Sequence, residues 1–264
     1  MTPLLEGKKG IVTGLVNEYS FAYHILKSLL AHKAEVGLAH LPAAAVERRV
    51  KKIAEAEGIS FICPMDAQSD ESIGTGFEAI AAHFGSIDFF VHSIAFANAE
   101  DLEGRFVNTS RRGFSLALDV SAYSFVAMAR EAAKIMPNGG SLVTLSYLGG
   151  ERVIPNYNVM GVAKAALEAS VRYVAFDLGS SNIRANAISA GPQRTLAASV
   201  VGDIDKMIDF TGKVSPLKRN IEGKEVGETA VYLLSDLSSG VTGEVLHVDC
   251  GYSIMGAPSL TSFP

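Results

Sequence analysis

The sequence predicts an α/β fold, a single domain built on a doubly wound, seven-stranded parallel sheet. Short apolar runs alternate with longer stretches of helical periodicity along the chain, as they do in βαβ units. Several of these runs are apolar at successive positions, which is typical of strands that are buried on both faces. With 264 residues, 48% of them hydrophobic, the chain is long enough to enclose one large core.

The elements follow one another in a regular order. Seven short apolar runs are expected to be strands, at 10–14 (GIVTG), 35–40 (EVGLAH), 60–66 (SFICPMD), 88–97 (DFFVHSIAFA), 141–147 (SLVTLSY), 183–192 (IRANAISAGP) and 243–249 (GEVLHVD). Helices are expected at about 21–32, around residue 50, and at about 70–84, 113–136 and 157–179. In the last two, apolar residues recur at steps of three and four, so each helix should bury one face.

One stretch, 193–216, lacks a clear period and follows directly on a strand. Long loops in compact domains are usually functional, so this segment is expected to be a substrate-binding loop that covers a cleft. No linker, repeat or low-complexity tract interrupts the chain, and residues 1–264 are expected to form one domain.

Charge and cysteine content exclude several classes of function. The net charge of −5 gives no basic surface for nucleic acid. The only cysteines, Cys63 and Cys250, do not make a disulfide framework, which favours the reducing cytoplasm. Neither cysteine belongs to a CxxC motif and the six histidines lack metal-site spacing, so no metal is expected. No apolar run has membrane-spanning length, so no membrane association is expected.

A possible phosphate-binding turn follows the first strand. Gly14 ends the strand where the chain must turn, and Ser20 suits the N-cap of the next helix. Unpaired N–H groups and the helix dipole make such a helix start attractive to anions. The glycine spacing is not that of the G-x-G-x-x-G fingerprint, so an ordinary strand-to-helix connection is the alternative.

The residues at the ends of the second and third strands indicate how a dinucleotide cofactor could be bound. In Rossmann-type folds the second strand usually ends in an acid or a base that contacts the adenosine ribose, but here it ends in His40 and Leu41. Neither NADH nor NADPH is selected by these residues alone. Asp66 follows the third strand and is placed either to bond an adenine amino group or to cap the following helix.

Tyr157 and Lys164 are seven residues apart in a stretch predicted to be helical. Seven steps of about 100° bring the two side chains within roughly 20° of each other on one helix face. They are separated by roughly 10.5 Å along the axis, which is too far for a direct hydrogen bond. We therefore expect the two groups to contact different parts of one bound molecule.

Longer motifs extend over essentially the whole chain. They are G-x5-S-x-A at 14–22, VHSIAFA at 91–97, VSAYSFVAMA at 120–129, LSYLG at 145–149, PNYNVMGVAK at 155–164, RANAISAGPQRTLAAS at 184–199 and LLSDLSSGVTGEVLHVD at 233–249. In these motifs the chain resembles the bacterial NADH-dependent enoyl-acyl-carrier-protein reductases. That family is a branch of the short-chain dehydrogenase/reductase superfamily.

The resemblance implies a reaction and roles for three residues. Hydride passes from NADH to C3 of a trans-2-enoyl thioester on acyl-carrier protein, a step of type II fatty acid synthesis. Tyr157 would bond the thioester carbonyl oxygen, and Lys164 would hold the nicotinamide ribose hydroxyls. Tyr147 would be the second active-site tyrosine, or the aromatic wall of the pocket.

The resemblance also implies binding residues and an assembly. The cofactor-binding positions are Gly14, Ser20, Phe21, Leu41, Asp66, Ala67, Ile94, Lys164, Gln193, Arg194, Thr195, Leu196 and Ala197. Ala97, Tyr147 and Tyr157 would line the substrate site, and the two long helices would assemble a homotetramer. The chain departs from the family at Leu41, often glutamine there, at Gln193, usually aliphatic, and at Ala95 and Cys250, which replace glycines.

Two other functions are weighed against this one. A carbonyl reductase or alcohol dehydrogenase of the wider superfamily needs a lysine four residues after the tyrosine, but position 161 is Gly. A catalytically silent NAD-binding regulator would be expected to have lost Tyr157 or Lys164, and both are present.

Overall fold

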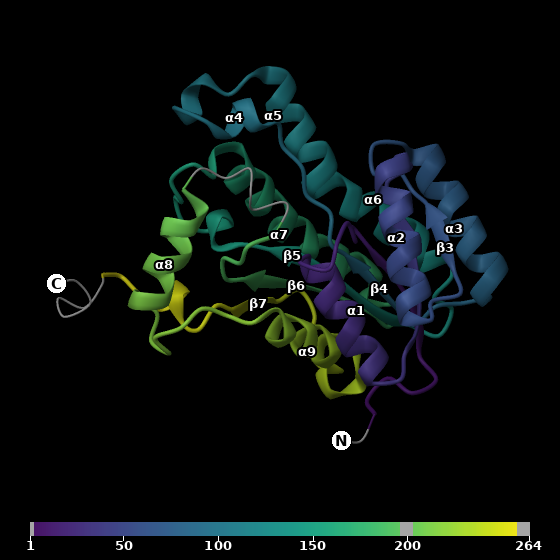
Figure 1. The fold of residues 1–264 in the computed structure, drawn as a ribbon. Helices are drawn as coiled ribbons and strands as arrows, with labels where there is room; N and C mark the ends of the chain where they lie inside the picture. The colour runs from purple at the N-terminus through teal and green to yellow at the C-terminus, as the bar shows by residue number, and fades with distance from the viewer. Residues whose placement is uncertain (1–2, 196–202, 258–264) are drawn as a thin grey trace.

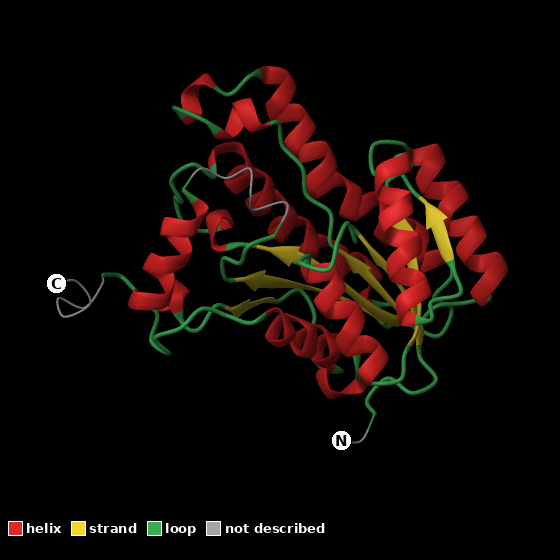
Figure 2. Cartoon of the chain, in the orientation of Figure 1, coloured by secondary structure: helices red, strands yellow, loops and turns green. Residues whose placement is uncertain are grey.

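A computed structural model describes residues 3–195 and 203–257, and it contains one seven-stranded parallel sheet (Figures 1 and 2). The strands are β1 (Lys9–Thr13), β2 (Glu35–His40), β3 (Ile62–Pro64), β4 (Phe89–His92), β5 (Gly140–Ser146), β6 (Ile183–Ala190) and β7 (Val245–Val248). Their order in the sheet is β3-β2-β1-β4-β5-β6-β7, the doubly wound order of dinucleotide-binding folds. All seven predicted strands are therefore present, and the predicted fold class is confirmed.

Helices cover both faces of the sheet (Figure 2). They are α1 (Phe21–Ala31), α2 (Ala44–Glu57), α3 (Asp70–Phe84), α4 (Ala99–Leu102), α5 (Arg111–Leu118), α6 (Ser124–Lys134), α7 (Asn158–Gly179), α8 (Ile204–Val214) and α9 (Gly223–Leu234). Among the described residues none of these helices is long and apolar enough to cross a membrane. Helices α4 and α5 extend beyond the sheet at the top of Figure 1.

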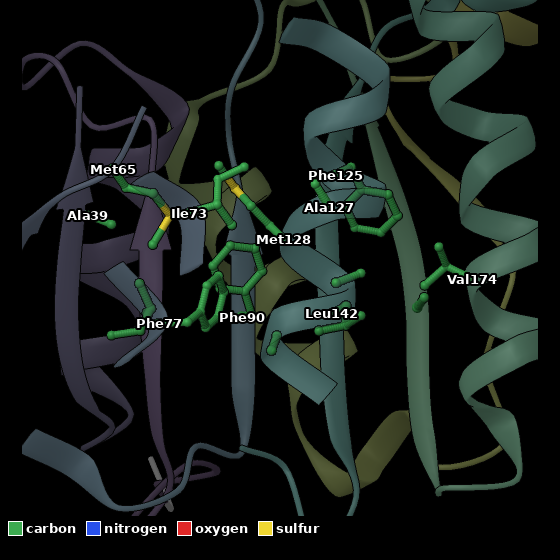
Figure 3. Packing of buried hydrophobic residues seen from close by; sticks show 14 of the residues in the cluster. Ala39, Met65, Ile73, Phe77, Phe90, Phe125, Ala127, Met128, Leu142 and Val174 are labelled. Atoms are coloured by element: carbon green, nitrogen blue, oxygen red, sulfur yellow. The ribbon is translucent and has the colours of Figure 1, made fainter. Parts of the chain in front are cut away.

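Two apolar cores lie on opposite sides of the sheet because successive strand residues face opposite ways. In β4, Phe90 packs into the core under α3, α6 and α7, and its neighbours Phe89 and Val91 pack under α1, α2 and α9. Figure 3 shows the first of these cores, in which Phe90 lies among Phe77, Met128 and Leu142. Burial on both faces explains why the strand sequences are apolar without alternation.

The strand β4 is shorter than the predicted run 88–97 and ends at His92. Beyond it the backbone bonds a helix instead of a neighbouring strand. The Phe96 N–H donates to Ser121 Oγ at 2.9 Å, and Ser121 Oγ donates to the Phe96 carbonyl at 3.1 Å. Hydrogen bonds from the Ser121 side chain thus replace strand pairing after the carboxyl end of β4, the edge of the sheet where the candidate site lies.

The helix predicted at 113–136 is interrupted by a π-helical turn, η2 (Asp119–Tyr123), between α5 and α6. A π turn adds one residue to the helical repeat, and such turns often occur at functional sites. Here the turn presents Ser121 to the segment after β4, and Ser124 Oγ donates back to the Val120 carbonyl at 2.6 Å. Helical conformation therefore continues from 111 to 134 as predicted, and the π turn within it, where these local bonds compete with the regular pattern, is the feature that the sequence does not indicate.

His92, at the end of β4, is fully buried between two hydroxyl groups. Its Nδ1 lies 2.9 Å from Thr144 Oγ1 and its Nε2 lies 2.8 Å from Ser124 Oγ. Burial, assisted by the nearby charge of Lys164, lowers the pKa of His92 from 6.5 to about 3. The imidazole is therefore neutral at neutral pH and well into the acidic range.

This burial predicts a pH dependence of stability. Between about pH 3 and 6.5 the unfolded chain binds a proton at His92 that the folded chain does not, so stability falls as the pH falls. The free energy of unfolding should decrease by about 2 kcal/mol from this group between pH 7 and pH 5. His92→Gln retains a polar side chain that does not titrate. In urea unfolding, its free energy of unfolding should therefore decrease by about 2 kcal/mol less than that of the wild type between pH 7 and pH 5. Equal pH dependence in both proteins would contradict the prediction.

Candidate active site

Tyr147 and Tyr157 meet in front of the carboxyl end of β5. Tyr147 follows that strand, and Tyr157 immediately precedes α7. Their ring centroids are 4.9 Å apart with an interplanar angle of 75°, an edge-to-face contact. The Tyr157 ring packs on Gly149, where a Cβ atom would lie 2.3 Å from its Cδ1. A glycine is thus required at 149 for the tyrosine to occupy this position.

Both phenols are neutral hydrogen-bond donors. Burial raises the pKa of Tyr157 well above its ordinary value of 10, and the neighbouring Tyr147 and Glu168 raise it further. Burial likewise raises the pKa of Tyr147. Neither group can serve as a base near neutral pH, but each can donate to an oxygen that gains negative charge.

Lys164 lies in the second turn of α7, seven residues after Tyr157, which is the N-cap residue of that helix. The side chain is buried, and Nζ donates to the Leu145 carbonyl of β5 at 2.6 Å. Burial lowers the pKa of Lys164 to about 8, and the carboxylate of Glu168 opposes this shift. The ammonium group is therefore still charged at neutral pH, and it is fixed by the strand rather than by the tyrosine.

Gly161 occupies the position four residues after Tyr157. A Cβ atom there would lie 2.7 Å from the carbonyl oxygen of Gly149, and this neighbour is a backbone atom that cannot rotate away. The structure thus leaves no room for the lysine that the carbonyl-reductase alternative requires. That alternative is not supported.

The turn after β1 is built for a close approach of backbones. Gly14 has φ +77°, and a Cβ atom there would lie 1.8 Å from the Ser93 carbonyl oxygen after β4. Ser20 is the N-cap of α1 and its hydroxyl accepts from the Tyr23 N–H, which confirms the predicted capping role. Phe21 is the first residue of the helix. The chain leaves β1 toward one side of the sheet and leaves β4 toward the other side. The point between these two strands is bordered by Gly14, Phe21 and the start of α1.

The remaining predicted positions lie along the same edge of the sheet. Leu41 follows β2 and is half exposed, Asp66 and the buried Ala67 follow β3, and Ile94 follows β4. The Asp66 carboxylate accepts from the Gln68 N–H at 3.0 Å, and Ser69 caps α3. The alternative in which Asp66 is the helix cap is thus wrong.

On the β6 side, Gln193, Arg194 and Thr195 follow the strand, and Leu196 and Ala197 lie outside the described residues. Gln193 Nε2 lies 3.5 Å from His24 Nε2, and its buried Oε1 has no hydrogen-bond partner within the described part of the chain. Arg194 pairs with Asp205 of α8 at 2.7 Å. The strand end and α8 are connected by this pair.

The segment 193–216 was expected to be an irregular loop, but residues 204–214 form α8. The helix starts at Asp203, which has φ +59° and makes no side-chain cap bond, so no capping signal marks its beginning. Tyr147 Oη donates to Met207 Sδ at 3.2 Å, and the ring of Phe210 faces that of Tyr252. A helix therefore covers the tyrosine pair where a loop was predicted.

Ala97 belongs to a small apolar cluster beside the tyrosines. It is buried with Val159, Met160 and Ala163 of α7, and Ala95 and Tyr157 pack against them. The predicted substrate-site positions Ala97, Tyr147 and Tyr157 are thus brought together by β4, β5 and α7.

Known proteins match this architecture over nearly the full chain. Residues 14–253 match the family described as enoyl-(acyl carrier protein) reductase. The chain is 49% identical to the enoyl-acyl-carrier-protein reductase (NADH) of Rickettsia typhi over 98% of this chain and 99% of that protein. It is 52% identical to the corresponding Bacillus cereus protein over 96% and 99%.

The chain belongs to the enoyl-acyl-carrier-protein reductase family. Solved structures of the family superpose closely. The Anaplasma phagocytophilum reductase in complex with NAD has a TM-score of 0.93 and 46% identity, covering 98% of this chain and 97% of that one. The Bacillus cereus reductase with NADP+ and an indole naphthyridinone has a TM-score of 0.95 and 49% identity, covering 97% and 100%.

Within this reductase fold, two residues beside Lys164 escaped the sequence reasoning. Glu168 is buried one turn after Lys164 on α7, and Ser146 Oγ donates a short hydrogen bond to its carboxylate. Glu168 stands among the apolar positions of an amphipathic helix, and this position could have marked it in the sequence. Buried carboxylates are rare without partners, so a partner was to be expected. The sequence does not show that Ser146, in a different element, is that partner.

The tight packing of Gly161 gives a prediction for this reductase. Gly161→Ala should lower kcat/KM at least tenfold and destabilise the protein by about 1–3 kcal/mol, because α7 must move away from Gly149. Gly179→Ala, at the end of the same helix, adds its Cβ to open space and should leave activity unchanged. Steady-state kinetics and urea unfolding compare the two variants, and wild-type activity in Gly161→Ala would contradict the packing argument.

Proposed function

We propose that this protein is an enoyl-acyl-carrier-protein reductase that uses NADH to reduce the C2–C3 double bond of trans-2-enoyl thioesters in type II fatty acid synthesis. The observation that carries the proposal is the arrangement on α7. Tyr157, immediately before the helix, supplies a neutral phenol, and Lys164, in its second turn, supplies a charged amine; Gly161 between them has no room for a side chain.

The described residues fit a dinucleotide. The Gly14 turn lacks a side chain at the closest approach of two strand ends, and it leads into the N-terminus of α1, where a pyrophosphate is favoured. Gln193 Oε1, which has no hydrogen-bond partner among residues 3–195 and 203–257, is an acceptor beside that helix. Leu41 and Asp66 border the adenosine side, while Ile94, Lys164, Arg194 and Thr195 border the nicotinamide side, and Leu196 and Ala197 are proposed to continue it.

When bound, NADH would supply the hydride for C3 of the enoyl chain, and the enolate that results would take up a solvent-derived proton at C2 to give the saturated thioester. Tyr157 donates its hydroxyl proton in a hydrogen bond to the thioester oxygen, where negative charge develops as C3 is reduced. Tyr147, in edge contact with Tyr157, closes the other side of the site. Lys164 binds ribose hydroxyls through its ammonium group and keeps the site electropositive.

NADH is the preferred cofactor because no cation follows β2. Leu41 stands where a 2′-phosphate would lie, and placing a dianion against an apolar side chain is unfavourable. His40 is buried, and its Nδ1 lies 2.9 Å from the Leu41 carbonyl oxygen. It is therefore directed at the main chain rather than at the cofactor.

The proposal extends to the carrier, the assembly and the compartment. The substrate is the thioester of acyl-carrier protein, and 193–216 with α8 binds its acyl chain. Tyr173 and Phe176 of α7 are 74% and 84% exposed, an aromatic face that favours a homotetramer formed through the long helices. Both cysteines are free and buried, in keeping with the cytoplasm.

Initial rates test the function directly. Loss of NADH absorbance is measured at pH 8 with crotonyl thioester, then with acetoacetyl thioester and with NADPH in place of NADH. We expect rapid turnover of the enoyl substrate with NADH and little with the ketone. Faster reduction of the acetoacetyl thioester would favour a carbonyl reductase, and no turnover of either would favour a silent regulator.

A further inference from the structure

Glu168 is a buried carboxylate next to the proposed site, and the mechanism above does not use it. Only 6% of its surface is exposed, and it lies four residues after Lys164 on α7. Burying a carboxylate costs free energy unless charged groups or hydrogen-bond donors surround it. The groups around Glu168 therefore indicate its role.

Two adjacent residues of β5 bind two residues one turn apart on α7. The Leu145 carbonyl accepts from Lys164 Nζ, and the Ser146 hydroxyl donates to Glu168 Oε1. The next residue of the strand is Tyr147. The strand and the helix are thus joined by two hydrogen bonds, one made by Lys164 and one made by Glu168, at the two strand residues that precede Tyr147.

The main chain after Tyr147 closes over the carboxylate. A Cβ atom at Gly150 would lie 2.8 Å from Glu168 Oε1 and 3.2 Å from the Ala165 nitrogen. The turn 148–150 therefore packs against the acid without space for a side chain. Glu168 is only slightly exposed to solvent, and low exposure strengthens the interaction between charges behind the turn.

The charged and titratable groups around the pair are few. Lys164 is influenced by Glu168 from its own helix and acts on His92, which is neutral, in β4. Burial raises the pKa of Glu168 and the hydrogen bond from Ser146 opposes this shift, while Glu151 after the turn, His247 of β7 and Arg172 further along α7 have smaller effects. Glu151 and His247 lie 2.8 Å apart and pair with each other. Among the described groups, Glu168 is the negative charge that acts on Lys164.

We propose that Glu168 is a positioning residue of the reductase, which holds the buried ammonium of Lys164 in its charged form and is itself fixed by Ser146. The inference rests on the proposed role of Lys164 in binding the cofactor. Glu168 touches neither substrate nor cofactor, and it acts through Lys164.

A change at Glu168 should therefore appear as a pH effect. The pKa of Lys164 is about 8 with Glu168 in place, because burial lowers it and the carboxylate opposes the shift. Without that negative charge the ammonium loses its proton at lower pH. If only the charged form binds the ribose, cofactor affinity should fall in proportion to the charged fraction.

The test uses Glu168→Gln, which keeps the shape and an acceptor for Ser146 but removes the charge. Protein labelled with 13C at lysine Cε is titrated by NMR without cofactor, and NADH dissociation constants are measured by fluorescence from pH 6.5 to 9. We expect the Lys164 midpoint to fall by about one pH unit or more and the NADH dissociation constant at pH 7.5 to rise about threefold.

Two further variants separate charge from structure. Glu168→Asp keeps the charge and should return the midpoint toward the wild-type value. Glu151→Gln removes the neighbouring carboxylate, which pairs with His247, and should leave the midpoint unchanged. A wild-type Lys164 midpoint in Glu168→Gln would overturn the inference. A lowered midpoint with unchanged NADH affinity would support the role of Glu168 and contradict instead the proposed cofactor role of Lys164.

Discussion

Replacing Tyr157 by phenylalanine should lower kcat/KM for an enoyl thioester by about 10²–10³-fold, the usual effect of removing one donor to a developing oxyanion. The phenylalanine ring retains the edge contact with Tyr147 and the packing on Gly149, so the fold should be preserved. Because the hydroxyl is proposed to bind the substrate and not the cofactor, the NADH dissociation constant should change less than twofold. Steady-state kinetics and NADH fluorescence titration measure the two quantities.

Tyr173→Phe is the matched control, since Tyr173 lies on the same helix but is 74% exposed. Its kinetics should equal those of the wild type. An effect of Tyr157→Phe smaller than tenfold would mean that another group, with Tyr147 the nearest, stabilises the charge on the thioester oxygen.

Replacing Gly14 by alanine should raise the NADH dissociation constant at least tenfold and lower the free energy of unfolding by several kcal/mol. The new Cβ would lie 1.8 Å from the Ser93 carbonyl oxygen, and 3.2 Å from the Ile94 nitrogen. The strand ends cannot simply separate, because Thr13 Oγ1 donates to the Val91 carbonyl at 3.0 Å. Overpacking of about 1–3 kcal/mol therefore adds to the cost of a positive φ, about 1–2 kcal/mol.

Gly7→Ala isolates the cost of placing alanine at a positive φ. Gly7 has φ +81°, but nothing lies within 4 Å of its Cβ position. This variant should lose only about 1–2 kcal/mol of stability and bind NADH normally. If both variants behaved alike in cofactor titrations and urea unfolding, the close approach of β1 and β4 would not be what defines the phosphate turn.

The fold was predictable because its signals are local or periodic. Apolar runs such as 35–40 and helical stretches such as 70–84 coincide with β2 and α3, since burial on both sheet faces selects those patterns. The helix expected at 157–179 likewise coincides with α7, which begins directly after Tyr157 and contains Lys164. Sequence reasoning succeeds where a single element determines the geometry.

It fails where two elements determine the geometry together. The π turn depends on Ser121 meeting the main chain of Phe96, 25 residues earlier. The environment of Glu168 depends on Ser146 in another element, and α8 begins at an uncapped Asp203. Such contacts leave no periodic trace in the sequence, and only the assembled chain reveals them.

The position of β1 in the sheet has a consequence for biosynthesis. Gly10, Ile11 and Val12 pair on one side with β2, which is made next, and on the other with Phe89, Phe90 and Val91 of β4. Roughly 75 residues separate the two strands, so at about 5–20 residues per second a ribosome needs about 4–15 s to supply the partner. During that interval the nascent chain carries an apolar strand with one unpaired edge, a surface prone to aggregation that chaperones bind.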